Sequence, residues 1–339
     1  MITLTSPRGS AIVIFFAACV ALTSTRCVAH SNTRPAVLSG YLIVVKGVAA
    51  SSDRGDLVIV SLSDGSLATV AHSVATSDTP TYSPATNSVI ATKYVGTSTE
   101  ITSYDTGAAS EKSLTEGRGP SVHGDKLAFC DLAGRLAVMD LTTMATSVVA
   151  ELRALTSCIP FAWSHDGRLA FIARSPLGAT APAPVDLFIQ DANGYLRDVP
   201  VSEAEFGATD VSWSDDDSYI AVSADHRQIV VKESTTGRTA FTLTGDRARY
   251  AADSHELAVL QYSTSDTDAL LATYDGARRT RTLSLGRVRR PGFDWIAGGN
   301  AIALTLDDSF GVWRLDDDAL SKTQLANELF SNVRFVPQR

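Results

Sequence analysis

Seven arginines stand shortly before recurring aromatic-led strand motifs, in segments that we predict to be loops. Arginine presents a planar fork of N–H donors that fits carboxylate and phosphate groups at two points. We therefore predict an anion- or acidic-partner-binding face formed by these side chains: Arg118, Arg153, Arg247, Arg249, Arg287, Arg289 and Arg290. Acids of adjacent loops offer an alternative, in which they neutralise the arginines: Asp53, Asp56, Asp225, Asp266, Asp268, Asp307 and Asp308. Surface ion pairs of this kind are common and weak, so the sequence leaves both interpretations open.

Histidines and clustered acids are the other side chains with the chemistry to hold a ligand. His123, His165 and His255 fall in turns of different repeats, and a metal would require them to converge within a few ångströms. We interpret them as solvent-exposed turn residues. The acidic runs at 215–217, 307–308 and 316–318 lack the alternating spacing of a calcium loop and are interpreted as solvated turns. We expect no metal, no cofactor and no catalytic residue.

The charge balance and the absence of familiar catalytic motifs narrow the function further. The chain has 29 Lys and Arg against 37 Asp and Glu, a net charge of −8, so we expect no nucleic-acid binding. It contains no phosphate-binding loop, dinucleotide fingerprint, HExxH or EF-hand pattern and no GxSxG nucleophile elbow. An enzyme is therefore the less favoured class.

The elements that must position these residues are internal repeats. Residues 161–173 (FAWSHDGRLAFIA) and 211–223 (VSWSDDDSYIAVS) both read aromatic, Ser, acidic turn and apolar strand. Weaker copies occupy 81–92, 121–130, 249–260 and 293–304, and they place equivalent residues at Tyr82, Val122, Trp163, Trp213, Tyr250 and Trp295. These positions are 40, 41, 50, 37 and 45 residues apart. Two further strand-like runs with a turn between them follow each copy, which gives four short strands per unit.

A period near 40 with four strands per unit predicts a β-propeller. Residues 39–339 number 301, and 301 divided by seven is 43. Residues 39–70 supply three strands of a unit without its first strand, whereas 332–338 resemble a first strand with nothing after it. We therefore predict an all-β, seven-bladed propeller whose C-terminal strand closes the first blade and removes two open sheet edges. Six blades are the alternative.

Stacked blades also give structural roles to aromatic and cysteine residues. A large ring on each first strand is expected to fill the wedge between neighbouring blades. Cys130 and Cys158 fall at the facing ends of adjacent blades, so we predict a disulfide between them; two buried free thiols are the alternative. The bond would close a loop of about 27 residues and add roughly 3 kcal/mol in the chain-entropy model.

The first 29 residues have the pattern of a secretory signal peptide. Residues 11–22 (AIVIFFAACVAL) form an apolar run of 12, which is short for a membrane span, and Ala29 ends a small-x-small cleavage pattern. A lipoprotein signal at Cys27 and an uncleaved anchor are the alternatives. Cleavage removes Arg8 and Arg26, so the mature chain has 27 positive and 37 negative side chains, a net charge of −10. We expect a signal peptide at 1–29, a linker at 30–38, a propeller at 39–339, and export without a stable membrane span to the periplasm, the cell surface or the medium.

The segment WSHDGRLAF and, less closely, WSDDDSYIAV resemble the repeat of TolB-type, WD40-like β-propellers of bacterial envelopes. Members of that group serve as binding platforms, assembly factors and accessory domains of peptidases. The resemblance implies the propeller fold and does not choose among these roles. With the arginine-rich loops and the absence of catalytic motifs, we expect a non-catalytic binding or scaffold protein that engages a protein or an anionic ligand through its loop-rich face, with a partner in the cell envelope or outside the cell. The alternative is a small propeller enzyme, lactonase- or lyase-like, with a site at the mouth of the central channel.

Overall fold

The computed structural model describes residues 40–47, 53–106, 110–150, 161–174, 185–200, 208–224, 227–263, 268–288, 291–296, 298–307, 309–324 and 329–336. All of them belong to one compact unit, Leu38–Arg339. The predicted signal peptide and linker, residues 1–38, lie outside the described residues. Within the described part of the chain, no helix has the length and apolar character needed to cross a bilayer.

The described secondary structure consists of antiparallel β-strands, as the repeat pattern predicts. The largest sheet has eight strands: β28 (Leu329–Val336), β1 (Tyr41–Gly47), β2 (Arg54–Ser61), β3 (Leu67–Ala75), β5 (Ser88–Val95), β6 (Ser98–Asp105), β7 (Glu111–Glu116) and β4 (Thr81–Ser83), which pairs with β5. A single residue pair, Val74 with Lys93, joins β3 to β5. This sheet therefore consists of two four-stranded sets that touch at one point.

The other described strands form five four-stranded sheets. The first contains β8 (Arg118–His123), β9 (Lys126–Cys130), β10 (Leu136–Asp140) and β11 (Thr146–Ala150). The second contains β12 (Phe161–Trp163), β13 (Leu169–Arg174), β14 (Val185–Gln190) and β15 (Leu196–Pro200). The third contains β16 (Ala208–Trp213), β17 (Tyr219–Ala224), β18 (Gln228–Glu233) and β19 (Thr239–Thr244). The last two contain β20 (Arg247–Tyr250), β21 (Glu256–Tyr262), β22 (Ala269–Asp275) and β23 (Arg278–Gly286), then β24 (Gly292–Ile296), β25 (Ala301–Thr305), β26 (Ser309–Arg314) and β27 (Ala319–Gln324).

Tight hairpins connect successive strands, because glycine at the turns adopts a backbone conformation that other residues avoid. Gly194 has φ +85° and donates its N–H to the Asp191 carbonyl at 3.0 Å. Gly237 has φ +74° and donates to the Glu233 carbonyl at 2.9 Å. Both lie in the DANG and STTG turns, where positive φ favours glycine.

The C-terminal strand β28 pairs with the N-terminal strand β1, as predicted. The register aligns Tyr41 with Val336 and Gly47 with Leu329, with one bulge between Ile43 and Val45. The first sheet is thereby assembled from both ends of the unit. This pairing covers an edge of β1 that would otherwise present unpaired N–H and C=O groups.

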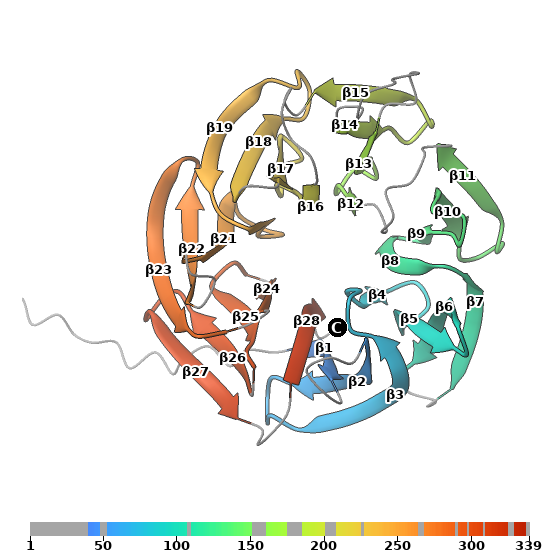
Figure 1. Cartoon of the computed structure of the whole chain (residues 1–339), viewed down its shortest axis with the longest axis horizontal. Helices are drawn as coiled ribbons and strands as arrows, with labels where there is room; N and C mark the ends of the chain where they lie inside the picture. Colours follow the sequence, from blue (N-terminus) through green and yellow to red (C-terminus); the bar gives the residue numbers. More distant parts are fainter. Residues whose placement is uncertain are drawn as a thin grey trace, which may run out of the picture. The chain divides into compact units, whose positions relative to one another are not determined.

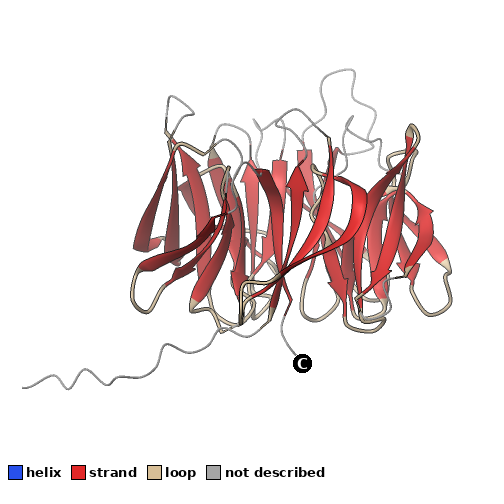
Figure 2. Ribbon diagram, turned by 90° about the horizontal axis from the view of Figure 1, so that it is seen from below, coloured by secondary structure: helices blue, strands red, loops and turns tan. Residues whose placement is uncertain are grey.

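The sheets stand around a common axis with their strands running between two faces (Figures 1 and 2). The described residues form seven apolar clusters, each built from two successive four-stranded sets. One of them packs Leu42 and Val58 against Ala303 and Phe310, which joins the last set to the first. Burial of these strand faces is the main source of stability in such a fold.

Tryptophans on the inner strands link each sheet to the one before it. The Nε1–H of Trp163 donates to the Ser121 carbonyl at 3.1 Å. Trp213 donates to Ala162 at 3.0 Å, and Trp295 donates to Arg249 at 2.8 Å. The rings also enter the apolar clusters between sheets. The packing role predicted for the aromatic position is therefore confirmed at these three residues, with an added hydrogen bond.

Candidate functional site

A cavity of about 870 Å³ lies between the innermost strands. Figure 1 shows these strands around the centre of the arrangement. Residues of β8, β12, β16, β20, β24 and β28 line it, together with the connection at 77–80 that leads into β4. Thr81 of β4 also lines it, so all seven strand sets contribute, and the cavity exists only because the repeats assemble around one axis. Such a central cavity is a usual place for a ligand site.

Arg249 is the centre of a charged network in this cavity. Its side chain is 14% exposed and lies between two carboxylates, with Nε 3.7 Å from Asp210 Oδ2 and Nη1 3.5 Å from Asp294 Oδ1. Burial alone would lower the pKa of Arg249, but the two carboxylates outweigh that effect and raise the pKa above its ordinary value. Arg249 therefore stays charged and ties strands β16, β20 and β24 together.

Two further arginines extend the network at its ends. Arg247 Nη2 lies 3.4 Å from Asp210 Oδ2, and Arg334 Nη1 lies 3.8 Å from Asp294 Oδ1. We call the resulting series Arg247–Asp210–Arg249–Asp294–Arg334 the arginine–aspartate chain. It contains three guanidinium groups and two carboxylates. The end arginines are 31% and 37% exposed, and each contacts a carboxylate at a distance longer than a tight charge-assisted hydrogen bond.

In the arginine–aspartate chain, a backbone N–H group donates to the second oxygen of each carboxylate. Asp294 Oδ2 accepts from the Phe335 N–H at 3.0 Å, and Asp210 Oδ1 accepts from the Val211 N–H at 3.0 Å. The carboxylates are therefore fixed by the strands, whereas the end arginines line the cavity and are about one-third exposed. The arrangement can bind a carboxylate or phosphate at either end of the arginine–aspartate chain, beside Arg247 or Arg334.

Asp78 serves to hold the wall of the cavity. Its Oδ2 accepts from the Gly119 N–H at 2.9 Å and from Thr92 Oγ1 at 2.7 Å. Asn332 Nδ2 donates to the backbone carbonyls of Thr76 and Asp78. These bonds fix the 77–80 connection against β8 and β28. Asp78 is thus a structural acceptor in the lining of the cavity.

The structure places the predicted arginines in several environments. Arg118, Arg247 and Arg249 line the cavity, but they lie on strands β8 and β20 and not in loops as predicted. These inner strands begin before the aromatic-led motif, because ladder pairing already starts at Arg118 with Cys130 and at Arg247 with Leu260. Arg287 follows β23, is exposed and does not line the cavity. Arg153, Arg289 and Arg290 lie outside the described residues.

For two of the seven arginines, the predicted source of neutralising charge is corrected. The acids that pair with Arg247 and Arg249 are Asp210 and Asp294 on inner strands, not the predicted loop acids. Sequence reasoning missed both, and it missed Arg334 as well. A usable signal existed, since Asp294 and Arg334 each immediately precede the aromatic residue of their repeat.

The three turn histidines do not gather in one place. His123 and His165 line the cavity, and His123 lies against Trp163 with ring centroids 5.7 Å apart. His255 does not line it and contacts acids of a neighbouring turn instead. The side chains of His165 and His255 are 54% and 63% exposed, as expected for turn residues.

Cys130 is disulfide-bonded. It ends β9, where it pairs with Leu136 on one side and Arg118 on the other. Cys158 lies outside the described residues, so the Cys130–Cys158 pairing stays a prediction.

Comparison with known proteins identifies the fold. No family model matches the chain, and no curated protein matches its sequence. Among solved structures, TolB from Acinetobacter baumannii superposes with a TM-score of 0.54 at 13% identity, covering 89% of this chain and 68% of that one. Apo AztD from Citrobacter koseri gives a TM-score of 0.60 at 10% identity and covers 88% of this chain and 98% of that one.

A third structure, a candidate 6-phosphogluconolactonase from Bacteroides uniformis, gives a TM-score of 0.61 at 14% identity. The match covers 88% of this chain and 100% of that one. The chain is a β-propeller. At these identities the likeness extends to the fold, and different proteins carry different sites on this fold. The activity of this propeller must therefore be argued from its own residues.

Proposed function

We propose that this chain is an exported, seven-bladed β-propeller that acts as a non-catalytic binding protein. Its central cavity takes an anionic group, either from a protein partner in the envelope or outside the cell or from a small ligand. The arginine–aspartate chain carries this proposal. It places surplus positive charge in a cavity of a protein whose net charge is −8.

Seven blades are supported by the strand sets and their packing. The eight-stranded sheet divides at one residue pair, which gives two sets, and five four-stranded sheets follow. The apolar cluster between the last set and the first joins the ends of the series. Export is supported by the apolar run at 11–22 and the cleavage pattern that ends at Ala29.

Charge complementarity gives the binding proposal its physical basis. Asp210 and Asp294 each have two arginine neighbours, so neither end arginine is fully compensated. A carboxylate entering the cavity replaces water at these guanidinium groups with charge-assisted hydrogen bonds in a partly desolvated space. The same attraction falls as ionic strength rises, because these groups are about one-third exposed.

The experiment uses the full chain, exported by its own leader and purified without a tag, with citrate and oligoglutamate as probes. We expect either probe to raise the thermal unfolding midpoint at low salt, and the double variant Arg247→Gln/Arg334→Gln to lose that increase. The matched control is Arg278→Gln, which alters an arginine 79% exposed on β23 and paired with Asp275. No increase with either probe, or an equal loss in the control, would overturn the proposal.

The enzyme alternative requires a different set of side chains in the cavity. A lactonase- or lyase-like site needs metal ligands or acid–base groups that converge at the channel mouth. Among the described residues, the group of three metal-ligating side chains lies on turns at the rim and not among the cavity-lining residues. Metal-dependent lactone hydrolysis abolished by Arg249→Gln would favour the enzyme over the binding protein.

The export proposal has its own measurement. Protein recovered from outside the cytoplasm is expected to begin at His30 when its N-terminus is sequenced. A chain that begins at Met1 in that fraction would show an uncleaved anchor, and a lipid-modified Cys27 would show a lipoprotein.

A further inference from the structure

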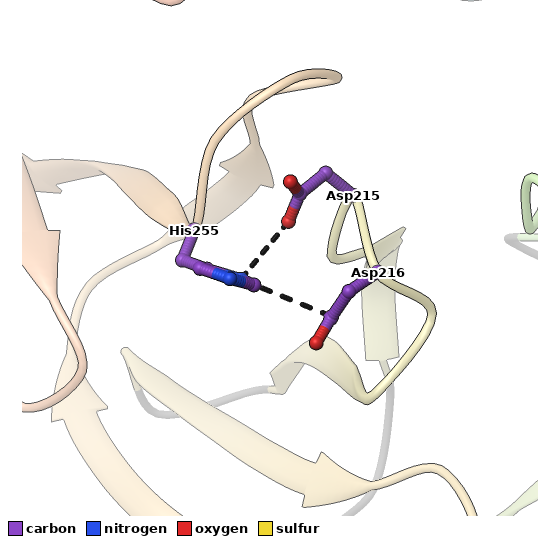
Figure 3. A group of neighbouring side chains, drawn as sticks. All are labelled: Asp215, Asp216 and His255. Atoms are coloured by element: carbon purple, nitrogen blue, oxygen red, sulfur yellow. Dashed lines mark ion pairs between the residues drawn. The ribbon is translucent and has the colours of Figure 1, made fainter.

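Two neighbouring turns on the rim bring an imidazole between two carboxylates (Figure 3). The β16–β17 turn supplies Asp215 and Asp216, and the β20–β21 turn supplies His255. His255 Nδ1 lies 3.0 Å from Asp215 Oδ1 and 3.9 Å from Asp216 Oδ1. One ligand atom from each residue lies within 4.8 Å of the other two. None of the three belongs to the central cavity.

The Oδ1 atom of Asp215 is the observation that points to a ligand. This oxygen is buried from solvent and accepts no hydrogen bond from any described residue. It forms a 3.0 Å ion-pair contact with the His255 imidazole nitrogen, outside hydrogen-bond geometry, and the Asp215 side chain as a whole is 22% exposed. A buried carboxylate oxygen without a donor costs free energy unless something else compensates its charge.

The adjacent turn junctions show how this fold normally satisfies such an acid. Asp217 accepts the backbone N–H groups of His165 and Asp166, both at 2.9 Å, from the preceding sheet. Asp253 accepts the backbone N–H of Gly298 from the following sheet. At the junction between these two, Oδ1 of Asp215 accepts no hydrogen bond from a described residue and faces His255 instead. Of these three junctions, the one at Asp215 differs from the others, because an imidazole nitrogen faces the acid there in place of a backbone N–H group.

We propose that Asp215, Asp216 and His255 form a binding site for a divalent metal ion of the zinc class. Zinc–oxygen and zinc–nitrogen bonds of about 2.0–2.2 Å in a tetrahedral site place ligand atoms about 3.4 Å apart. The distances of 3.0 and 3.9 Å in this group bracket that value. A mixed nitrogen and carboxylate set suits zinc and its neighbours, whereas calcium and magnesium prefer sites made of oxygen alone.

The second carboxylate is held in position by its own turn. Asp216 Oδ1 accepts from Ser214 Oγ at 2.7 Å and from the Ser218 N–H at 3.0 Å. Supporting hydrogen bonds of this type orient metal ligands. The site is accessible, because His255 also borders a surface groove of about 530 Å³. Three protein ligands leave a fourth position for water or for a group that enters from that groove.

A bound ion would join two sheets at the rim. Asp217 already links the same turn to the preceding sheet, because it accepts the backbone N–H groups of His165 and Asp166 in the β12–β13 turn. The metal would add a contact between the third and fourth of the five four-stranded sheets. Binding is therefore expected to stabilise the folded chain in proportion to metal occupancy.

The test is a calorimetric titration of Zn²⁺ into the chelator-treated, tag-free full chain. We expect one equivalent to bind at this site, with a thermal midpoint increase of about 5 °C at a hundredfold excess over Kd. Loss of an outer-shell partner alone costs about 10- to 100-fold in metal affinity, so His255→Gln and Asp215→Asn are each expected to weaken binding by at least that factor. Millimolar Ca²⁺ is expected not to compete.

The matched control is His72→Gln. His72 is another exposed histidine, 78% exposed and 2.7 Å from a single carboxylate, Asp56. It should leave Zn²⁺ binding unchanged, and circular dichroism without metal should show that all three variants fold. The proposal is overturned if the wild type binds no Zn²⁺, if both site variants keep wild-type affinity, or if His72→Gln weakens binding as much as they do.

Discussion

The central cavity and the rim turns both bring acids against basic side chains of neighbouring sheets, but they satisfy those acids differently. In the cavity, Asp210 and Asp294 share Arg249 and also accept backbone N–H groups. At the rim, Asp215 faces His255 with a buried oxygen that accepts no hydrogen bond from the described residues. Satisfied acids hold the fold together, and the unsatisfied one marks a place for a ligand.

The surplus charge in the central cavity is opposite in sign to the surplus charge at the rim. The arginine–aspartate chain has three guanidinium groups for two carboxylates, so its ends favour an anion. The rim group has two carboxylates for one imidazole, so it favours a cation. One propeller thus offers two separate sites of opposite charge, one on the inner strands and one on the rim turns.

The largest effect is expected from Arg249→Met, which tests whether the cavity network is structural. It leaves two partly buried carboxylates without their shared partner, and removal of one member of a buried ion pair costs about 3–5 kcal/mol. Urea unfolding measures the free energy of unfolding. A loss below about 1 kcal/mol would show that the network behaves like a surface ion pair.

The next prediction compares substitutions of two aspartates in the same rim turn, Asp217 and Asp215. Asp217→Asn removes a charge that accepts two backbone N–H groups, and we expect a loss of about 1–3 kcal/mol. Asparagine suits the φ of +58° at this position, so backbone strain does not confound the result. Asp215→Asn in metal-free protein is expected to change stability by less than about 0.5 kcal/mol. Equal losses at the two positions would remove the distinction between satisfied and unsatisfied acids.

Substitutions at the ends of the cavity network are also expected to have small effects on stability. Arg247→Gln and Arg334→Gln should each change the free energy of unfolding by less than about 1 kcal/mol, because each side chain is about one-third exposed and loosely paired. Their effect should appear in ligand binding instead. Losses as large as that of Arg249→Met would make them structural residues.

The sequence predicts the repeats well because the aromatic position and the glycine turns are local signals. Trp163, Trp213 and Trp295 lie on inner strands as expected, and β28 joins β1. The period near 40 also locates the four strands of each unit. These features depend on residues that are near one another in the chain, so pattern reasoning reaches them.

The site is less predictable because it depends on contacts between sheets. Arg249 and Asp294 are 45 residues apart in the sequence, and Arg334 reaches the network only because the last strand pairs with the first. Asp215 and His255 likewise meet only across a junction between sheets. When the repeats are aligned on their aromatic residues, Arg249, Asp294 and Arg334 share the position immediately before the aromatic residue, and that is the signal that the sequence offered.

The most direct test of the binding account is an equilibrium titration of labelled oligoglutamate into the full chain at low and physiological ionic strength. Wild-type protein should bind, with an affinity that falls as salt increases. The double variant Arg247→Gln/Arg334→Gln should bind at least about tenfold more weakly, as expected for the loss of charge-assisted hydrogen bonds. Equal binding by the two proteins, or no binding by either at low salt, would contradict the account.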